Sequence, residues 1–374
     1  MYALLFSGAG LSAGEISLLF TLWSVTTFVL EIPSGALADR VSRRHLLAVG
    51  GLLRVVGFAL WLVWPTFLGF AAGFVLWGAN IALVSGTWDA LVYDELAALD
   101  ARNRYTQIVG RTEVIGVLGA LGATAVAAPL VAVGGFQAAG WTSVAISCVA
   151  ALLPLTLPDG RPVRSADGTG FTGYLRTLRS GLSEAVHHRP VRRVLLAAAL
   201  LTGFGAVDEY LPLLTESMGL SPAVVPLLLL APSVALAVGA EMAGRVAEMS
   251  PRQAAVVAAA GAMTFAAGVL SGHPAGFLAI GAGYGAISCV SLITEARLQD
   301  AITGPRATVT SVSGFGTEVS AVMIFAGMGA GGGLVALPAL LATTALPLLV
   351  LSAVLPRWIP RGVPATGGEP DTGR

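Results

Sequence analysis

The chain has 374 residues, of which 55% are hydrophobic and only 11% are charged, and its 21 basic residues are balanced by 21 acidic ones. A water-soluble domain carries about 25% charged residues, so this composition excludes an ordinary soluble protein. The balanced charge gives no reason to expect a nucleic-acid partner.

Eleven apolar segments are long enough to cross a bilayer, which takes about 20 residues. They lie at 16–38, 46–64, 67–93, 110–133, 137–157, 193–214, 222–243, 253–271, 275–294, 308–330 and 334–355. The stretch Met1–Phe6 is apolar as well, but it is too short to span and is followed at once by the loop-like Ser7–Gly10. We interpret it as the last turns of a first helix whose beginning is missing.

The arginines, which are the only basic residues, fall almost entirely in alternate connections between these segments. The connections around Gly10, Pro65, Gly134, Gly219, His273 and Gly332 contain none. Cytoplasmic loops retain Lys and Arg. We therefore expect a multi-pass protein of a bacterial-type inner membrane, with the arginine-rich side and the C-terminus in the cytoplasm.

A long polar segment divides the spans into two sets. We assign residues 1–157 to an N-terminal bundle, 158–192 to a cytoplasmic central loop, 193–356 to a C-terminal bundle and 357–374 to a cytoplasmic tail. Short patterns recur in order between the two sets, such as Gly10-Leu11-Ser12 and Gly219-Leu220-Ser221. Such self-similarity indicates two halves of one design.

A charged motif follows the segment 16–38. It runs from Gly35 through Leu37, Asp39, Arg40 and Arg43 to Arg44. Asp39 can accept hydrogen bonds from arginines or lie at the positive end of a neighbouring helix. This motif resembles the loop motif of the major facilitator superfamily, from which it departs at Ser42, where glycine is usual.

The resemblance implies an all-α membrane protein of two six-helix bundles, here with eleven full helices and a truncated first one. It further implies alternating access, with the motif acting as a latch between the halves. We expect no enzymatic activity, because no histidine lies at membrane depth and no serine or cysteine there has an evident base beside it.

Three ionisable residues of the first bundle lie at membrane depth, where charge is costly. Glu31, Arg54 and Asp89 are expected to form a buried ion-pair network. A structural pair that fixes helix packing is favoured over a coupling site, because the third helix is peripheral in the family fold. Asp89 also remains a candidate for proton coupling or substrate binding.

The second bundle offers further candidates for proton coupling or substrate binding. Asp208, Glu209 and Tyr210 are adjacent in the segment 193–214, where two neighbouring carboxylates repel each other. Glu318 lies roughly 15 Å into its span and has no basic neighbour one turn away. We expect it to face the central cavity or to find a partner across the halves.

Charged residues near the ends of the spans are expected to make contacts at the cytoplasmic face, and Arg245 is expected to pair with Glu241 one turn earlier. The set consists of Asp94, Arg111, Arg245, Glu295, Arg297 and Arg306.

These observations predict a secondary transporter, with proton-coupled efflux of a small or drug-like molecule as first choice and uptake of a sugar or other metabolite as the alternative. A non-transporting membrane sensor is the rival class. The segment 67–93 lacks the arginine that drug–proton antiporters of the superfamily often carry, which weakens the efflux hypothesis. We expect no metal and no cofactor beyond the proton gradient, a small-molecule substrate, a lipid environment and a monomer.

Overall fold

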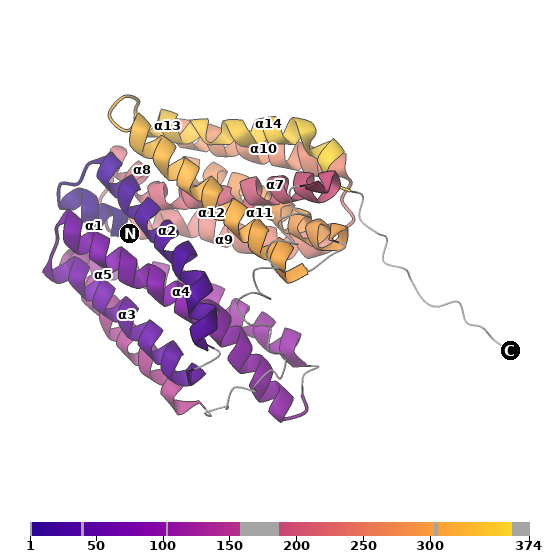
Figure 1. Ribbon diagram of the computed structural model, residues 1–374. Helices are drawn as coiled ribbons and strands as arrows, with labels where there is room; N and C mark the ends of the chain where they lie inside the picture. The colour runs from indigo at the N-terminus through magenta and orange to yellow at the C-terminus, as the bar shows by residue number, and fades with distance from the viewer. Residues whose placement is uncertain (1, 39–40, 102–103, 158–186, 303–305, 361–374) are drawn as a thin grey trace.

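A computed structural model describes residues 2–38, 41–101, 104–157, 187–302 and 306–360, and these residues are folded into helices (Figure 1). The first half contains α1 (Tyr2–Gly8), α2 (Ala13–Ala38), α3 (Arg43–Val63), α4 (Phe67–Ala98), α5 (Tyr105–Leu152) and the short 3₁₀ helix η2 (Leu153–Thr156). The second half contains α7 (Arg189–Gly203), the 3₁₀ helix η3 (Phe204–Tyr210), α8 (Leu211–Ser217), α9 (Val225–Arg245), α10 (Pro251–Leu270), α11 (Gly276–Ala301), α12 (Arg306–Gly331), α13 (Leu337–Thr343) and α14 (Ala345–Trp358).

Ten helical segments of the described residues are long and apolar enough to cross a membrane. One of them, 115–156, has 42 residues and is therefore long enough for two crossings. The backbone of α5 departs from helical geometry at Gly134 and Gly135, where Gly135 has φ 62° and ψ −161°. Only glycine adopts such a conformation readily, so the two segments expected at 110–133 and 137–157 are both present and meet at this pair.

The segment expected at 193–214 is less regular than its sequence suggests. It consists of α7, η3 and α8 in succession, so a 3₁₀ stretch interrupts the span. Pro212 lies at the start of α8 and has no N–H for the carbonyl of Asp208, which accepts instead from the N–H of Leu211. The last span is divided similarly into α13 and α14 at Thr344, three residues before Pro347.

The two halves lie side by side, with the first half below and the second half above in Figure 1. Within the first half α4 packs against α2 and α3, and within the second half α11 packs against α7, α9 and α10. Between the halves α2 packs against α12 and α5 against α9. The interface between the bundles is thus formed mainly by these two helix pairs, with a smaller contact between α1 and α8.

Glycines allow some of these helices to approach closely, as is common for helices in membranes. A Cβ atom on Gly239 of α9 would lie 2.2 Å from the carbonyl oxygen of Gly285 on α11. A Cβ atom on Gly57 of α3 would lie 2.8 Å from the carbonyl oxygen of Gly73 on α4. Larger residues at these positions would force the helices apart.

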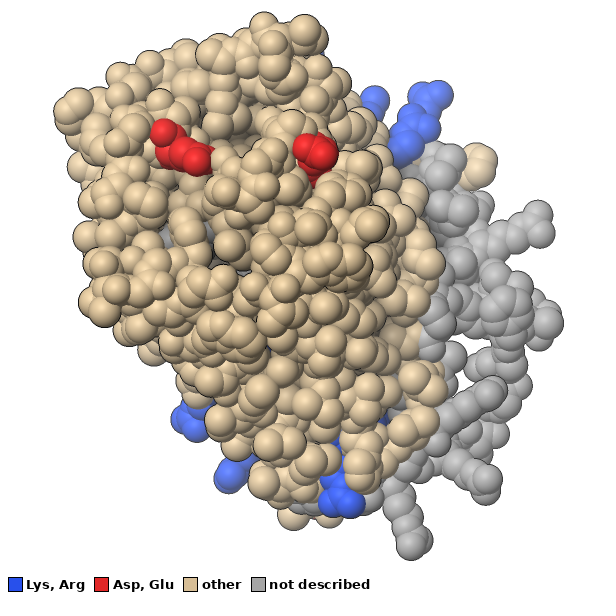
Figure 2. Space-filling model, turned by 90° about the vertical axis from the view of Figure 1, so that its left-hand side faces the viewer, with Lys and Arg blue, Asp and Glu red and all other residues tan. Residues whose placement is uncertain are grey.

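The ends of the molecule differ in charge. The connections next to α1, α8 and the start of α13 lie at one end, which we call the arginine-poor end because its described connections carry no arginine. Figure 2 looks onto this end and shows a surface that is almost entirely uncharged, with isolated acidic side chains and basic ones only toward the margin. Helix α14 ends at the opposite, arginine-rich end (Figure 1).

Candidate functional site: the contact between the halves

One face of α2 is directed at the second half. Ser17, Phe20, Ser24 and Phe28 follow one another at three- and four-residue steps, so they lie on a single stripe of the helix. Each of them contacts a residue of η3 or α12. The stripe therefore forms the first half's side of the interface.

Among the residues that the structure describes, three hydrogen bonds between side chains join the halves along this interface. The hydroxyl group of Tyr2 donates to Glu209, and that of Ser24 donates to Glu318. The hydroxyl oxygens of Ser17 and Tyr210 lie 2.8 Å apart. We call these six residues the interhalf seam.

Aromatic rings pack beside the polar contacts of the seam. The ring of Phe20 lies 5.6 Å from that of Tyr210 and 5.4 Å from that of Phe325. Nearer the arginine-rich end, Phe28 lies 4.9 Å from Phe315. Phe20, Tyr210 and Phe325 are almost completely buried, so the seam excludes water at this level.

The 3₁₀ helix η3 places Asp208 and Glu209 beside the seam. Tyr284 of α11 supports this segment, because its hydroxyl group donates to the carbonyl of Gly205 at 2.8 Å. Asp208 directly precedes Glu209 on η3 and therefore lies next to the contact that Glu209 makes with Tyr2. Its side chain is exposed, whereas that of Glu209 is half-buried.

This arrangement has the elements of a proton-dependent contact. A hydrogen bond to an ionised carboxylate is roughly twice as strong as one between neutral groups. Protonation of Glu209 or Glu318 would therefore weaken its bond across the halves. Within the described part of the chain, His, Cys, Asp and Glu do not gather in a group that could hold a metal ion.

The candidates for proton coupling or substrate binding that the sequence predicted in the second half differ in their position relative to the seam. Glu209, Tyr210 and Glu318 all belong to the seam, and Glu318 does find a partner across the halves, Ser24. Asp208 is next to the seam but makes no side-chain hydrogen bond to the other half among the described residues.

The ion-pair network expected in the first half is not seen among the described residues. Glu31 is exposed, and no ion pair joins it to Arg54. Arg54 is half-buried and its Nε atom has no hydrogen-bond partner. The side chain of Asp89 lies outside the described residues, so its part in the network stays a prediction.

The latch motif is described only in part. Asp39 and Arg40 lie outside the described residues, as does the environment of Gly35. Leu37 is exposed, while Arg43 is buried at the start of α3. Arg43 and Arg44 both have interaction partners in the structure.

The residues that were expected to make charge contacts near the ends of the spans differ in the interactions they make. Arg245 pairs with Glu241 at 3.0 Å, as the helical spacing predicts. Glu295 accepts a 2.6 Å hydrogen bond from the hydroxyl group of Thr202 on α7. Arg111 is exposed, and the side chains of Asp94 and Arg306 lie outside the described residues.

Among the described residues, the hydrogen bonds of Arg297 go to backbone carbonyls and not to an acidic side chain. Arg297 is buried on α11 and donates to three backbone carbonyls, those of Met249, Ala247 and Pro360, the last two at 3.3 Å. The guanidinium group can serve three acceptors because it carries five N–H donors in a planar fork. It thereby ties α11 to the segment after α9 and to the chain end after α14.

Sequence reasoning missed four residues of the site: Tyr2, Ser17, Ser24 and Tyr284. The signal for the two serines was available, because they are polar residues seven positions apart on one face of an apolar span. For the tyrosines no local pattern distinguishes a hydrogen-bonding hydroxyl group from an ordinary core ring.

Comparisons with known proteins agree with this architecture. Residues 1–324 match the family model described as Major Facilitator Superfamily. A search of curated proteins gave no match.

Solved structures resemble the chain over nearly its whole length. A crystal structure of a variant of the nucleoside transporter NupG has 13% sequence identity and a TM-score of 0.74, with 95% of this chain and 92% of that chain covered. A D-xylose–proton symporter has 13% identity and a TM-score of 0.69, with 95% and 91% covered. The xylose transporter XylE from E. coli, in a partially occluded inward-open conformation, has 14% identity and a TM-score of 0.63, with 96% and 89% covered. At such identities the likeness establishes the fold.

Proposed function

The chain belongs to the major facilitator superfamily and is a membrane transporter, not an enzyme. We propose that it works by alternating access and couples the movement of protons to the transport of a small organic molecule. The halves would rock about their shared interface and expose a central site to each side in turn. The interhalf seam would be the contact that opens and closes at the arginine-poor end.

The observation that carries this proposal is the pair of carboxyl groups in the seam. Glu209 and Glu318 belong to the second half and accept hydrogen bonds from Tyr2 and Ser24 of the first. Because proton uptake weakens such bonds, a proton entering the seam would favour separation of the halves at this end. Proton binding and gate opening are then linked, as coupled transport requires.

Uptake of a polar metabolite together with protons is the direction that the similar structures favour. One of them is a D-xylose–proton symporter and another a nucleoside transporter. A sugar symporter and a nucleoside transporter agree better with the alternative drawn from the sequence, uptake of a sugar or other metabolite, than with its first choice, efflux.

Efflux of a partly apolar molecule remains the second candidate, because the first half contains an aromatic cavity. A space of about 270 Å³ lies between α1, α3 and α5 and is lined by Tyr2, Phe58, Trp61 and Phe136 among others. Such a wall suits an apolar or aromatic ring.

The test uses the purified protein in proteoliposomes with an imposed proton gradient. A panel of labelled pentoses, labelled nucleosides and a lipophilic dye would be measured for accumulation with the gradient in each direction. We expect one class to accumulate in the wild type. Glu209→Gln and Glu318→Gln should lose gradient-driven accumulation while still exchanging labelled for unlabelled substrate.

The matched control is Glu216→Gln, because Glu216 is an exposed carboxyl group of α8 outside the seam. Gradient-driven accumulation that survives in the Glu209→Gln, Glu318→Gln double variant would refute coupling through the seam. Accumulation that ignores the gradient in the wild type would refute proton coupling altogether.

A further inference from the structure

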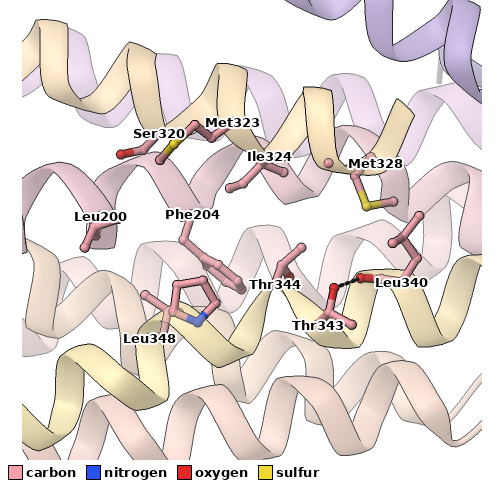
Figure 3. A pocket seen from close by; sticks show the side chains of 12 residues that line it. Leu200, Phe204, Ser320, Met323, Ile324, Met328, Leu340, Thr343, Thr344 and Leu348 are labelled. Atoms are coloured by element: carbon pink, nitrogen blue, oxygen red, sulfur yellow. Dashed lines mark hydrogen bonds between the residues drawn. The ribbon is translucent and has the colours of Figure 1, made fainter. Parts of the chain in front are cut away.

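A second cavity lies on the far side of α12 from the seam. It measures about 260 Å³ and is enclosed by α7, η3, α12, α13 and α14. Figure 3 shows Ile324 and Met328 of α12 on one side of it and Thr344 and Leu348 on the other. Phe204 of η3 lies at its base and is buried. We call this space the cavity behind α12.

The lining of this cavity is largely apolar and contains no charged residue. Its three hydroxyl groups already donate to nearby backbone carbonyls: Ser320 donates to Gly316 at 2.9 Å, Thr343 to Leu340 at 2.6 Å, and Thr344 to Leu341 at 2.6 Å. They can still accept a hydrogen bond but have no proton left to donate, so the occupant that suits the cavity best is a hydrocarbon chain.

The position of the cavity explains where such a hydrocarbon would come from. Both walls belong to segments long and apolar enough to span a membrane, 312–331 and 337–358. Its mouth is exposed at Met323, Gly327 and Pro347, whereas its floor is buried. At that depth the surrounding solvent is lipid chains, not water.

The helix geometry connects this cavity to the seam. Phe325 follows Glu318 by about two helical turns, so both point toward α2. Gly327 follows Glu318 by about two and a half turns and therefore points the opposite way, into the cavity. Whatever fills the cavity supports α12 from behind, on the side opposite its contact with α2.

We propose that the cavity behind α12 binds one acyl chain of a membrane phospholipid, and that an occupied cavity holds α12 against α2. The interface between α2 and α12 is continuous with the cavity through Met328, which belongs to the same buried cluster as Phe20 and Phe325. The proposal concerns a lipid site and does not depend on the identity of the transported molecule.

The test exploits Gly327, because a Cβ atom at this position would meet nothing within 4 Å. Gly327→Leu therefore adds its Cβ atom without a clash, and we expect the rest of the leucine side chain to extend into the cavity. Ala326→Leu is the matched control, since Ala326 is the preceding, exposed residue of the same helix and does not line the cavity. Met323→Trp is a second filling variant if Gly327→Leu fails to fold.

The first measurement is labelling by a phosphatidylethanolamine that carries a diazirine in the middle of one acyl chain, in membranes with the full-length protein. We expect labelled peptides from α12 and α14 in the wild type and in Ala326→Leu, and loss of that labelling in the filled variants. Equal labelling of filled and wild-type protein would overturn the proposal. So would labelling by the free diazirine fatty acid alone, or a cross-linked dimer at these helices, which would assign the cavity to a second copy of the chain.

The second measurement follows the seam. Ala13 and Gly332 face each other across the halves, because a Cβ atom on Gly332 would lie 3.1 Å from that of Ala13. In protein stripped of phospholipid in detergent, so that the unfilled cavity is empty, cysteines at both positions, with Cys148 and Cys289 replaced by alanine, should form a disulfide faster in Gly327→Leu, which mimics the bound chain, than in Ala326→Leu. A disulfide rate in Gly327→Leu that is equal to or slower than the rate in Ala326→Leu would overturn the proposal that a filled cavity holds α12 against α2.

Discussion

At the scale of single residues, the site depends on hydroxyl groups that donate to carboxyl groups of the other half. Glu209 and Glu318 receive such bonds from Tyr2 and Ser24, in a region where an ionised carboxyl group is costly. A hydrogen bond to a charged group contributes about 1.5–3 kcal/mol. Removal of one donor should therefore change how the halves associate.

Tyr2→Phe removes the hydroxyl group but keeps the ring and its aromatic contacts. We expect the population that is open at the arginine-poor end to rise at least about 10-fold, because a loss of about 1.4 kcal/mol changes the equilibrium constant between the closed and open forms tenfold. The measurement is the alkylation rate of Gly14→Cys by a membrane-impermeant maleimide, in protein without Cys148 and Cys289.

Ser233→Ala is the control for this variant, because the hydroxyl group of Ser233 bonds to Leu229 of its own helix at 2.8 Å. An alkylation rate in Tyr2→Phe that matches the rate in Ser233→Ala would show that the bond to Glu209 does not hold the halves together.

At the scale of elements, the interrupted span α7–η3–α8 decides where the carboxyl groups of the second half lie. A continuous α-helix would rotate Glu209 away from its observed position relative to Tyr2, because a 3₁₀ helix has 3.0 residues per turn instead of 3.6. Pro212 prevents regular α-helical bonding there, and Tyr284 supports the interrupted stretch from α11.

Tyr284→Phe tests this support. The carbonyl of Gly205 loses its side-chain donor, so we expect the free energy of unfolding to fall by about 1–3 kcal/mol. Transport coupling through Glu209 should weaken as well. Thermal unfolding in detergent and gradient-driven accumulation are the measurements, with Thr142→Val as the control because Thr142 bonds only within α5. A variant as stable and as active as the control would contradict the supporting role.

Arg297 is the corresponding support at the arginine-rich end. Replacement by methionine removes all three bonds to the carbonyls of Met249, Ala247 and Pro360. We expect a loss of about 1.5–3 kcal/mol or more in unfolding free energy, since charged donors make the stronger bonds. Arg252→Met, at an exposed position, should leave the unfolding temperature unchanged. Equal unfolding temperatures for the two variants would refute the role of Arg297.

At the scale of the whole molecule, function requires the two bundles to separate and rejoin. A disulfide between Ala13→Cys and Gly332→Cys would hold them together at the arginine-poor end. We expect oxidation to abolish net transport and a reductant to restore it. The reduced form of the same protein is the control, and full transport in the oxidised protein would refute a motion at this interface.

The number and order of the helices were readable from the sequence because they depend on local composition and period. The apolar runs predicted every span of the described residues, and the glycine pair at Gly134 and Gly135 marked the boundary inside α5. The alternation of arginines predicted which connections share an end. These signals are contained within each segment and need no knowledge of its neighbours.

Which side chains meet was decided only by tertiary structure. Tyr2 and Glu209 are 207 residues apart, and Ser24 and Glu318 are 294 residues apart. Helical period determines which face of a helix a residue occupies, but not which helix that face meets or how far each bundle is rotated. For the same reason the depth of Glu31 and Arg54 suggested an ion pair that the described residues do not form, whereas Arg245 and Glu241, one turn apart on one helix, pair as the sequence predicted.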